Sequence, residues 1–271
     1  MDGFVIRKWD GIHWHGSGRK LNRIEHIETL MEGIDGLIQR HGLKPDIFVD
    51  VGAYKAWWSR AANRLGYFNE IHAIEPNHRL ELRKKFDENH PIKVHTYAVG
   101  DKTEKVKFYF DSENGRIGTL DSDRRLYRRV TIEVRKRTID SFNFKGDCFF
   151  KIDVEDHEVP TLVGARETLT NNNCIVLIEI SKDPIISFDL MKSYGYEVCG
   201  YMFAEVMYPL DEDVLFTKNC NGLDIWTTPS GMILDYDVMV DDSKKQKAAK
   251  AGYDLTKENP LWADFIFKKV K

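Results

Sequence analysis

The chain has 271 residues, of which 42% are hydrophobic and 31% are charged, and its formal net charge is −3. This length supports a large single core, and the composition excludes a collagen-like or disordered chain. The small net charge argues against a general polyanion binder. No apolar run approaches the ~20 residues of a membrane helix, and the N-terminus has no secretory apolar core, so we expect a cytoplasmic protein without a membrane span.

The first half predicts a parallel β-α-β-α-β unit. Apolar residues recur at helical spacing through residues 22–42. Three apolar runs without alternation then predict strands covered on both faces, "DIFVDV", "EIHAIEP" and "IKVHTYAVGD". The segments between them predict helices, at Trp57–Leu65 and within "NHRLELRKKFDEN". Crossovers of this kind are right-handed and build a parallel sheet.

The middle of the chain has a different pattern. "EKVKFYFD" and "RRVTIEVRKRTID" alternate with period two, which predicts antiparallel or edge strands around a turn-rich loop. Strand and helix then alternate again, in the order "DCFFKIDVE", "VPTLVGARETL", "CIVLIEIS", "PIISFDLMKSYG" and "YEVCGYM". In the last quarter three segments are strand-like, "DVLFTKN", "GLDIWTTP" and "ADFIFKKV", and only some of them can join the main sheet.

No repeat or clear domain boundary interrupts this order. We therefore predict one α/β domain over residues 45–271, with residues 1–44 as an N-terminal helical extension packed on the core, and an antiparallel insertion in the middle. The polar stretch "DDSKKQKAAKAGYD" is expected to be a solvated linker or helix. The four cysteines form no CxxC pair, so we expect buried free thiols and a reducing compartment.

The end of the first strand predicts a nucleotide-cofactor site, because ligands of such sheets bind beyond the carboxyl ends of the strands. Asp50 ends that strand directly before Gly52. A dinucleotide loop needs further glycines and no carboxylate aimed at the phosphate. An acid suits the ammonium of S-adenosylmethionine better, and Glu75, at the end of the second strand, can accept hydrogen bonds from a ribose. The alternative is an acid that only caps the next helix.

A second group of acids follows the strand "FFKIDVE". Because side chains alternate along a strand, Lys151, Asp153 and Glu155 are expected on one face. Crowded carboxylates raise one another's pKa, which suits a general base for removing a hydroxyl proton. Glu155 and His157 are both candidate bases, Asp153 is expected near the methionine end of the cofactor, and Lys151 pairs with an acid or steadies an oxyanion.

Two other interpretations of these acids stay open. Together with Glu179, which ends the next strand, Asp153 and Glu155 can hold a divalent cation that orients two hydroxyls, although no metal motif supports this site and we predict no metal ligand. The acids can also be a solvated turn before a helix, where the helix dipole favours negative charge.

Six motifs in one order, "FVDVGAYKAWWSR", "IHAIEPNHRLELRKKF", "VHTYAVGD", "RTIDSF", "FFKIDVEDHEVPTLVGARETL" and "VLIEI", resemble the FkbM family of S-adenosylmethionine-dependent methyltransferases. The resemblance runs from about Ile47 to Tyr201. It implies a class I methyltransferase fold, a Rossmann-like and mostly parallel seven-stranded sheet flanked by helices. It also implies O-methylation of a sugar, glycan or polyketide-type hydroxyl.

The family loop reads D-x-G-A-N-x-G-x-x-S, and Tyr54 and Ala56 stand where the family has asparagine and glycine. A methyl group at position 56 restricts positive φ, and the Tyr54 ring can attract the sulfonium. Asp156 stands in the glycine position of D-V-E-G-H-E. The predicted contacts of S-adenosylmethionine are Asp50, Gly52, Ala53, Tyr54, Ser59, Glu75, Pro76, Asn77, Ala98, Val99 and Asp153, with Ala98 to Asp101 beside the adenine.

Three further features bear on the partner. The basic segment 124–137 can steer a phosphorylated substrate or RNA, or can be a solvated edge. The loop Gly115–Thr119 is expected to face the acceptor, and the "HWH" of His13–His15 to be a surface or lid feature over the cofactor. The rival functions are an RNA or nucleotide methyltransferase, a degenerate fold that acts as a binding module, and, less favoured, a nicotinamide enzyme. The sequence leaves the oligomeric state open.

Overall fold

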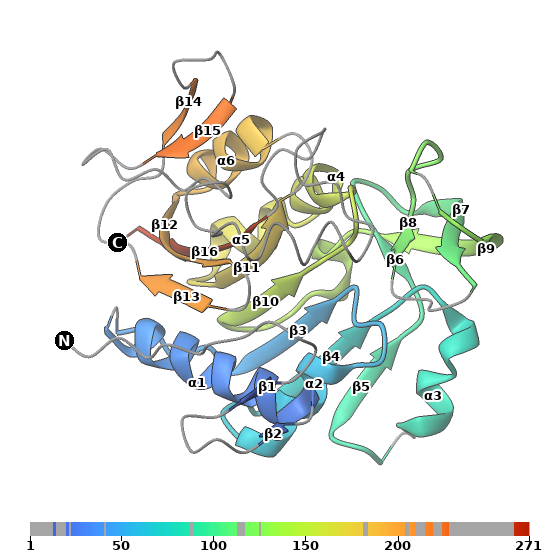
Figure 1. Cartoon of the computed structure of the whole chain (residues 1–271), viewed down its shortest axis with the longest axis horizontal. Coiled ribbons are helices and arrows are strands. Elements are labelled where there is room, and N and C mark those ends of the chain that lie inside the picture. Colours follow the sequence, from blue (N-terminus) through green and yellow to red (C-terminus); the bar gives the residue numbers. More distant parts are fainter. Residues whose placement is uncertain are drawn as a thin grey trace.

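The computed structural model describes residues 13–14, 20–21, 23–40, 42–86, 89–112, 117–124, 126–180, 184–203, 206–209, 215–218, 224–227 and 263–270. Its centre is an eight-stranded sheet with the order β13-β12-β16-β11-β10-β3-β4-β5 (Figure 1). The strands are β3 (Ile47–Val51), β4 (Glu70–Ile74), β5 (Ile92–His95), β10 (Cys148–Ile152), β11 (Ile175–Ile180), β12 (Tyr196–Phe203), β13 (Val206–Pro209) and β16 (Ala263–Lys269).

The strand directions are those of a class I methyltransferase. β3, β4, β5, β10 and β11 pair in parallel. β16 comes from the end of the chain and inserts antiparallel between β11 and β12. The predicted fold class is therefore confirmed. The seven predicted strands are present, and one strand more, because β13 adds antiparallel to β12 at the edge of the sheet.

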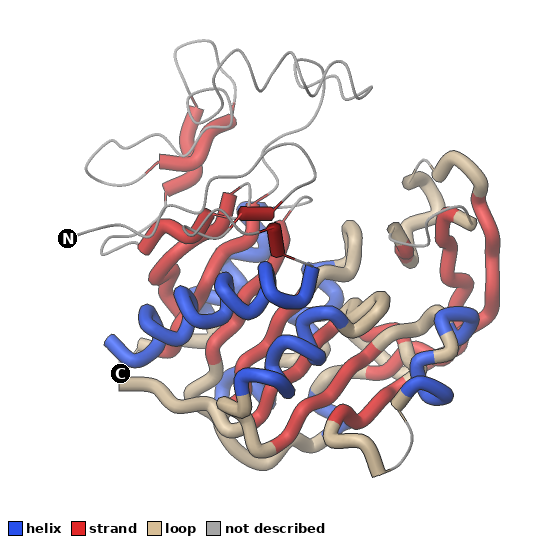
Figure 2. The backbone as a smooth tube through the Cα atoms, turned by 60° about the horizontal axis from the view of Figure 1, so that its bottom comes forward, coloured by secondary structure: helices blue, strands red, loops and turns tan. Residues whose placement is uncertain are grey.

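Helices cover both faces of this sheet, as buried strands require. α1 (Arg23–Arg40), α2 (Trp57–Leu65) and the short α3 (Leu82–Lys85) contribute to one core, which includes Ile27, Ala61 and Leu82. α4 (Glu158–Val163), α5 (Arg166–Asn171) and α6 (Pro184–Ser193) contribute Leu162, Leu169 and Met191 to the other. Figure 2 shows α1 and α2 side by side along one face.

A second, four-stranded sheet lies beyond the carboxyl ends of the main strands, with the order β6-β9-β7-β8. Its strands are β6 (Ala98–Val99), β7 (Glu104–Asp111), β8 (Gly118–Thr119) and β9 (Arg129–Arg137). The expected antiparallel insertion is thus present. The single strand expected over "IKVHTYAVGD" is wrong, because that segment divides into β5 and β6, and β6 pairs in parallel with β9.

Two expected helices are shorter than the sequence predicts. After β4 the chain forms a 3₁₀ turn, His78–Leu80, and then only α3, because Glu81 adopts a left-handed conformation with φ 55°. The helix expected over "VPTLVGARETL" divides into α4 and α5. The Asp140 carboxylate caps the start of α5, since it accepts hydrogen bonds from the backbone amides of Glu167 and Thr168.

The remaining described elements are small. β1 (His13–Trp14) pairs with β2 (Lys20–Leu21), β14 (Leu215–Lys218) pairs with β15 (Asp224–Thr227), and residues 140–142 form a 3₁₀ turn. Of the strand-like C-terminal segments, only β16 joins the main sheet. Three features of the sequence analysis lie outside the described residues: much of the expected lid around His13–His15, the "DDSKKQKAAKAGYD" stretch, and Cys220.

Two expectations about the whole chain can be compared with the described part. Cys148, Cys174 and Cys199 are buried free thiols, as expected. No helix in the described ranges has both the length and the apolar character to cross a membrane.

Candidate active site

The candidate site lies where the strand order of the main sheet reverses. β3 has β4 on one side and β10 on the other, so the chain leaves β3 in one direction and returns through β10 in the other. Ligands of doubly wound sheets bind at this switch point, beyond the carboxyl ends of the strands. The register places Asp50 of β3 directly opposite Lys151 of β10. Residues far apart in sequence therefore meet at this point.

Asp50 is a buried carboxylate with one oxygen in use. It is 1% exposed, and its Oδ2 accepts hydrogen bonds from Ser59 N at 3.1 Å and Ser59 Oγ at 2.7 Å. Its Oδ1 is buried and has no hydrogen-bond partner among the described residues. Burial raises the pKa of Asp50, which the positive charge of Lys151 partly offsets. A cationic group that reached Oδ1 would satisfy it.

Glu75 follows β4 and is held by two backbone amides. Tyr54 N donates to Oε2 and Asn77 N to Oε1, each at 2.8 Å. Burial raises the pKa of Glu75 to about 7 in spite of these bonds. Each oxygen keeps a lone pair after its one bond, and a pair of adjacent hydroxyls is a donor set that suits such a carboxylate.

Gly52 allows the loop after β3 to pass the chain after β10. A Cβ at this position would lie 1.8 Å from Asp153 O, and the φ of Gly52 is +78°. Gly52 N and Ala53 N both donate to Ile74 O, at 3.0 and 3.1 Å. These two amides are therefore committed within the protein, whereas a phosphate-binding loop would leave such amides open to the ligand.

The two unusual residues of this loop both adopt a left-handed backbone conformation. Tyr54 has φ 50° and Ala56 has φ 56°, although neither is glycine. The expected restriction at position 56 is thus overridden by packing, since Ala56 is fully buried. The Tyr54 ring meets Trp57 edge-on at 5.3 Å, and Lys55 Nζ lies 5.1 Å from the Tyr54 ring centroid. Whether a sulfonium also uses this ring stays a prediction.

Lys151 and Asp153 form an ion pair at the end of β10. Lys151 Nζ lies 2.6 Å from Asp153 Oδ2, and the Lys151 side chain is 7% exposed. Asp153 N donates to Val51 O at 3.0 Å, which ties the turn to β3. The expectation that Glu155 continues this face of the strand is wrong, because β10 ends at Ile152 and Glu155 adopts φ 53° in a turn.

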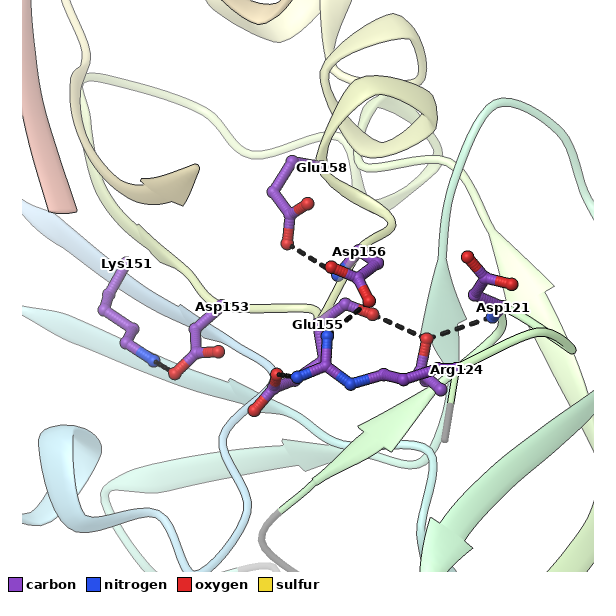
Figure 3. Close-up of polar contacts among 8 residues, drawn as sticks. Asp121, Arg124, Lys151, Asp153, Glu155, Asp156 and Glu158 are labelled. Carbon is purple, nitrogen blue, oxygen red and sulfur yellow. Dashed lines mark hydrogen bonds and ion pairs between the residues drawn. The ribbon is translucent and has the colours of Figure 1, made fainter. Parts of the chain in front are cut away.

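Glu155 nevertheless lies in the same acidic cluster, and a residue of the insertion holds it. Arg124 Nη2 donates to Glu155 Oε2 at 2.6 Å, and Arg124 Nη1 donates to Asp156 Oδ2 (Figure 3). Burial, and then the charge of Asp153, raise the pKa of Glu155 to about 7, although Arg124 opposes the shift. A carboxylate with this pKa is matched to proton removal near neutral pH.

Glu158 is a third buried acid, and the predicted site residues do not include it. It is 2% exposed, its Oε1 accepts a 3.2 Å hydrogen bond from Asp156 N, and its Oε2 has no partner among the described residues. Burial raises its pKa to about 8. The sequence signal that could have identified Glu158 as a site residue is its place as the last residue of the family motif D-V-E-G-H-E.

His157 differs from the other candidate base in its surroundings. A Cβ added to Gly100 would lie 2.8 Å from His157 Nε2 and 2.8 Å from Lys136 Cδ, so the imidazole packs against the chain after β6. The side chain of Lys136 is buried there and pairs with Asp101 and Glu104. These contacts pack the His157 imidazole against the chain after β6 and against the buried Lys136, whereas Glu155 is bonded to Arg124.

The adenine-side candidates lie at the edge of the same site. Ala98 and Val99 form β6 and are buried, each 4% exposed. Asn77 Oδ1 accepts a hydrogen bond from Arg79 N at 3.2 Å, and Pro76 lines a cavity of about 280 Å³ together with Tyr97. Pro76 and Asn77 thus follow β4, whereas Ala98 and Val99 belong to the insertion sheet through their pairing with β9, and their contact with an adenine stays a prediction.

The acids take part in an internal ion-pair network. Asp153 is paired with Lys151 and Glu155 with Arg124, and Glu179 acts electrostatically on Arg124. Within the described residues no group of three or more His, Cys, Asp or Glu side chains is arranged to hold a metal ion.

Comparison with known proteins gives one family and several distant structures. The Methyltransferase FkbM domain matches residues 50–204. The chain belongs to the FkbM methyltransferase family. No curated protein matches the sequence.

Three solved structures are distantly similar. Methyltransferase FkbM from Methylobacillus flagellatus KT is 16% identical, with a TM-score of 0.40 over 65% of this chain and 40% of that one. Precorrin-6y C5,15-methyltransferase from Geobacter metallireducens GS-15 is 12% identical, with a TM-score of 0.38 over 88% and 86% of the two chains. The O-methyltransferase from a trans-AT PKS multienzyme of Brevibacillus brevis, in complex with S-adenosyl-L-homocysteine, is 8% identical, with a TM-score of 0.37 over 91% and 71%.

Within the FkbM family pattern, the departures of this chain sit on strained backbone. Ala56 and Asp156 replace glycines of that pattern, and both have positive φ, 56° and 74°. Left-handed conformations cost about 1–2 kcal/mol for a residue with a Cβ. This chain therefore adopts left-handed backbone at these two positions without glycine, the residue that adopts it most easily.

Proposed function

We propose that this protein is an S-adenosylmethionine-dependent O-methyltransferase that acts on a hydroxyl of a sugar, a glycan or another small molecule. The observation that carries the proposal is the pair of buried carboxylates at the switch point. Asp50 Oδ1 has no hydrogen-bond partner in the part of the chain that the structure describes, and both oxygens of Glu75 are oriented by backbone amides. Family membership supports the same cofactor.

Asp50 and Glu75 suit two different parts of S-adenosylmethionine. Asp50 Oδ1 is a buried acceptor that suits an ammonium, and Glu75 suits the two hydroxyls of a ribose. A nicotinamide dinucleotide fits less well, because the Gly52 and Ala53 amides are already bonded to Ile74 O and a phosphate would approach the Asp50 carboxylate.

The chemistry requires little beyond positioning and removal of a proton. When bound, S-adenosylmethionine supplies an activated methyl group on a good leaving group. The chain has to hold the acceptor hydroxyl in line and accept its proton. Glu155 suits the second task, since its raised pKa of about 7 leaves a useful fraction ionised at neutral pH without making it a weak base. Lys151 holds Asp153 beside it.

RNA or nucleotide methylation has less support from the site. Arg124 and Lys136, two cations of the basic segment 124–137, are turned into ion pairs with acids of this chain. Their charges are therefore already paired within the protein. Other arginines of the segment, such as Arg129 and Arg135, are exposed, as expected for the solvated face of a strand.

The test is methyl transfer from S-adenosylmethionine with an isotope-labelled methyl group to panels of sugars, glycans and polyketide alcohols, with RNA as a parallel substrate. We expect the label on a hydroxyl oxygen, located by mass spectrometry, and its loss in Asp50→Ala. Label on RNA alone, or on nitrogen or carbon, contradicts the proposed acceptor class. Absence of any transfer by a folded protein that binds the cofactor favours a binding module.

A further inference from the structure

One arginine of the insertion sheet reaches the centre of the candidate site. Arg124 follows β8, and its guanidinium donates to Glu155 Oε2 at 2.6 Å and to Asp156 Oδ2 (Figure 3). The side chains of Arg124, Glu155 and Asp156 are 24%, 21% and 18% exposed. Solvent therefore screens these pairs less than it screens a surface pair.

A second contact ties the same two segments. Thr119 Oγ1 donates to the backbone oxygen of Glu155 at 2.5 Å and accepts a hydrogen bond from Asp121 N at 3.0 Å. The insertion thus holds Glu155 through both its backbone and its carboxylate. A planar guanidinium that bonds two carboxylates also fixes their orientation, which a single point charge does not.

The turn that the insertion holds is strained. Glu155 has φ 53° and Asp156 has φ 74°, and such conformations persist only where the surroundings enforce them. The glycine of the family pattern would relieve the strain at position 156 but would leave Arg124 with a single carboxylate. Asp156 therefore adopts a strained backbone conformation, but its carboxylate gives Arg124 a second ion pair beside the one with Glu155.

We propose that Arg124 is a positioning residue which, anchored by Asp156, orients the Glu155 carboxylate as the proton acceptor of methyl transfer. The catalytic part of this role rests on the proposed function, whereas the anchoring does not. With Oε2 of Glu155 bonded to Arg124, Oε1 is left to accept the hydroxyl proton. Misplacement of a base by a small distance costs rate, so an anchored guanidinium is an advantage.

The anchoring is testable because the charges around Glu155 shift its pKa in opposite directions: Arg124 and Lys151 lower it, and Asp153 and Asp156 raise it. The charged groups that act on Glu155 are Asp153, Arg124, Asp156, Lys151 and the buried Glu158, and Glu179 acts on Arg124. Loss of Arg124 raises the pKa of Glu155. Loss of the Asp156 charge by itself lowers that pKa. If Asp156 also anchors Arg124, its loss weakens the Arg124 effect, and the two changes in pKa offset each other.

The experiment follows the side-chain carboxyl carbon of Glu155 by ¹³C NMR as a function of pH, assigned with Glu155→Gln. It compares the native protein, Arg124→Gln, Asp156→Asn and the double variant, with Arg129→Gln as a control. Arg129 is a suitable control because it lies on β9, stacks over Tyr109 at 3.9 Å and is not among the main charged groups that act on Glu155. Circular dichroism verifies the fold of each variant, and the uncharged Arg124→Met replaces Arg124→Gln if the latter unfolds.

We expect the pKa of Glu155 to rise by about 1–3 units in Arg124→Gln and not in Arg129→Gln. Asp156→Asn should lower the pKa when residue 124 is glutamine, and should lower it by at most half as much when the arginine is present. Equal effects of Asp156→Asn in both backgrounds, or no rise in Arg124→Gln, overturn the proposal. These titrations need neither cofactor nor acceptor, so a failure of the anchoring is distinguishable from a failure of the proposed function.

Discussion

Gly52 offers the sharpest test of how the cofactor loop is built. A Cβ at position 52 would lie 1.8 Å from Asp153 O and 2.9 Å from Asp153 C, and the backbone has φ +78°. The obstructing atoms are backbone, which cannot rotate away as a flexible side chain does. Gly52→Ala therefore combines a left-handed conformation, about 1–2 kcal/mol, with a steric clash of about 1–3 kcal/mol.

Gly66 provides a matched control for this substitution. Its φ is +69°, close to that of Gly52, but a Cβ added there has no atom of the described residues within 4 Å apart from those of its chain neighbours. Gly66→Ala therefore has only the conformational cost, reduced by the lower entropy of the unfolded chain. The difference between the two variants isolates the clash, about 1–3 kcal/mol, which corresponds to about 2–12 °C in Tm for a chain of this size.

The assay is thermal and urea unfolding of both variants, followed by circular dichroism, with S-adenosylmethionine binding measured on the folded protein. We expect Gly52→Ala to be clearly the less stable variant and to lose the cofactor, and Gly66→Ala to retain it. Equal stability of the two variants would refute the close approach of the β3 and β10 loops.

Three further predictions follow from the buried acids and glycines. The folded-state pKa values of Glu75 and Glu158, about 7 and about 8, lie above the ordinary 4.5, so the folded state binds more protons and stability should fall as pH rises from about 5 to 8. Urea unfolding should show this slope and a smaller one in Glu158→Gln; a rising stability contradicts it. Ser59→Ala removes the hydroxyl donor to Asp50 Oδ2 and leaves the backbone amide donor in place, so it should cost about 1–3 kcal/mol in urea unfolding, and a cost near zero would mean that water replaces the hydroxyl. Gly164→Ala places a Cβ 2.0 Å from a backbone oxygen after β6 and should lower Tm by several degrees, although φ is ordinary; an unchanged Tm contradicts this packing.

The fold and the positions of Asp50 and Glu75 could be predicted because local pattern determines them. Buried parallel strands read as continuous apolar runs, and the first polar residue at each carboxyl end then falls at the ligand edge of the sheet. Asp50 and Glu75 are found in this way without knowledge of any contact. The ion pair of Lys151 with Asp153 is similarly local, since the two residues are close in sequence.

The role of Arg124 could not be predicted in the same way. Its partner Glu155 is 31 residues away, and the contact depends on how the whole insertion sheet lies over the main sheet. In the sequence Arg124 is only one cation in a basic run. The division of the helix after β10 has a similar origin, because the Asp140 carboxylate that starts α5 comes from a turn before β10.

The most direct test of the account is calorimetric titration of S-adenosylmethionine and S-adenosylhomocysteine into the purified protein, with Asp50→Ala and Glu75→Ala as controls. The account predicts binding with Kd in the range of about 1–100 µM, equivalent to about 5.5–8 kcal/mol, and its loss in both variants. No binding by a correctly folded protein, or unchanged binding in Asp50→Ala, would contradict the assignment of the buried carboxylates at the switch point as the cofactor site.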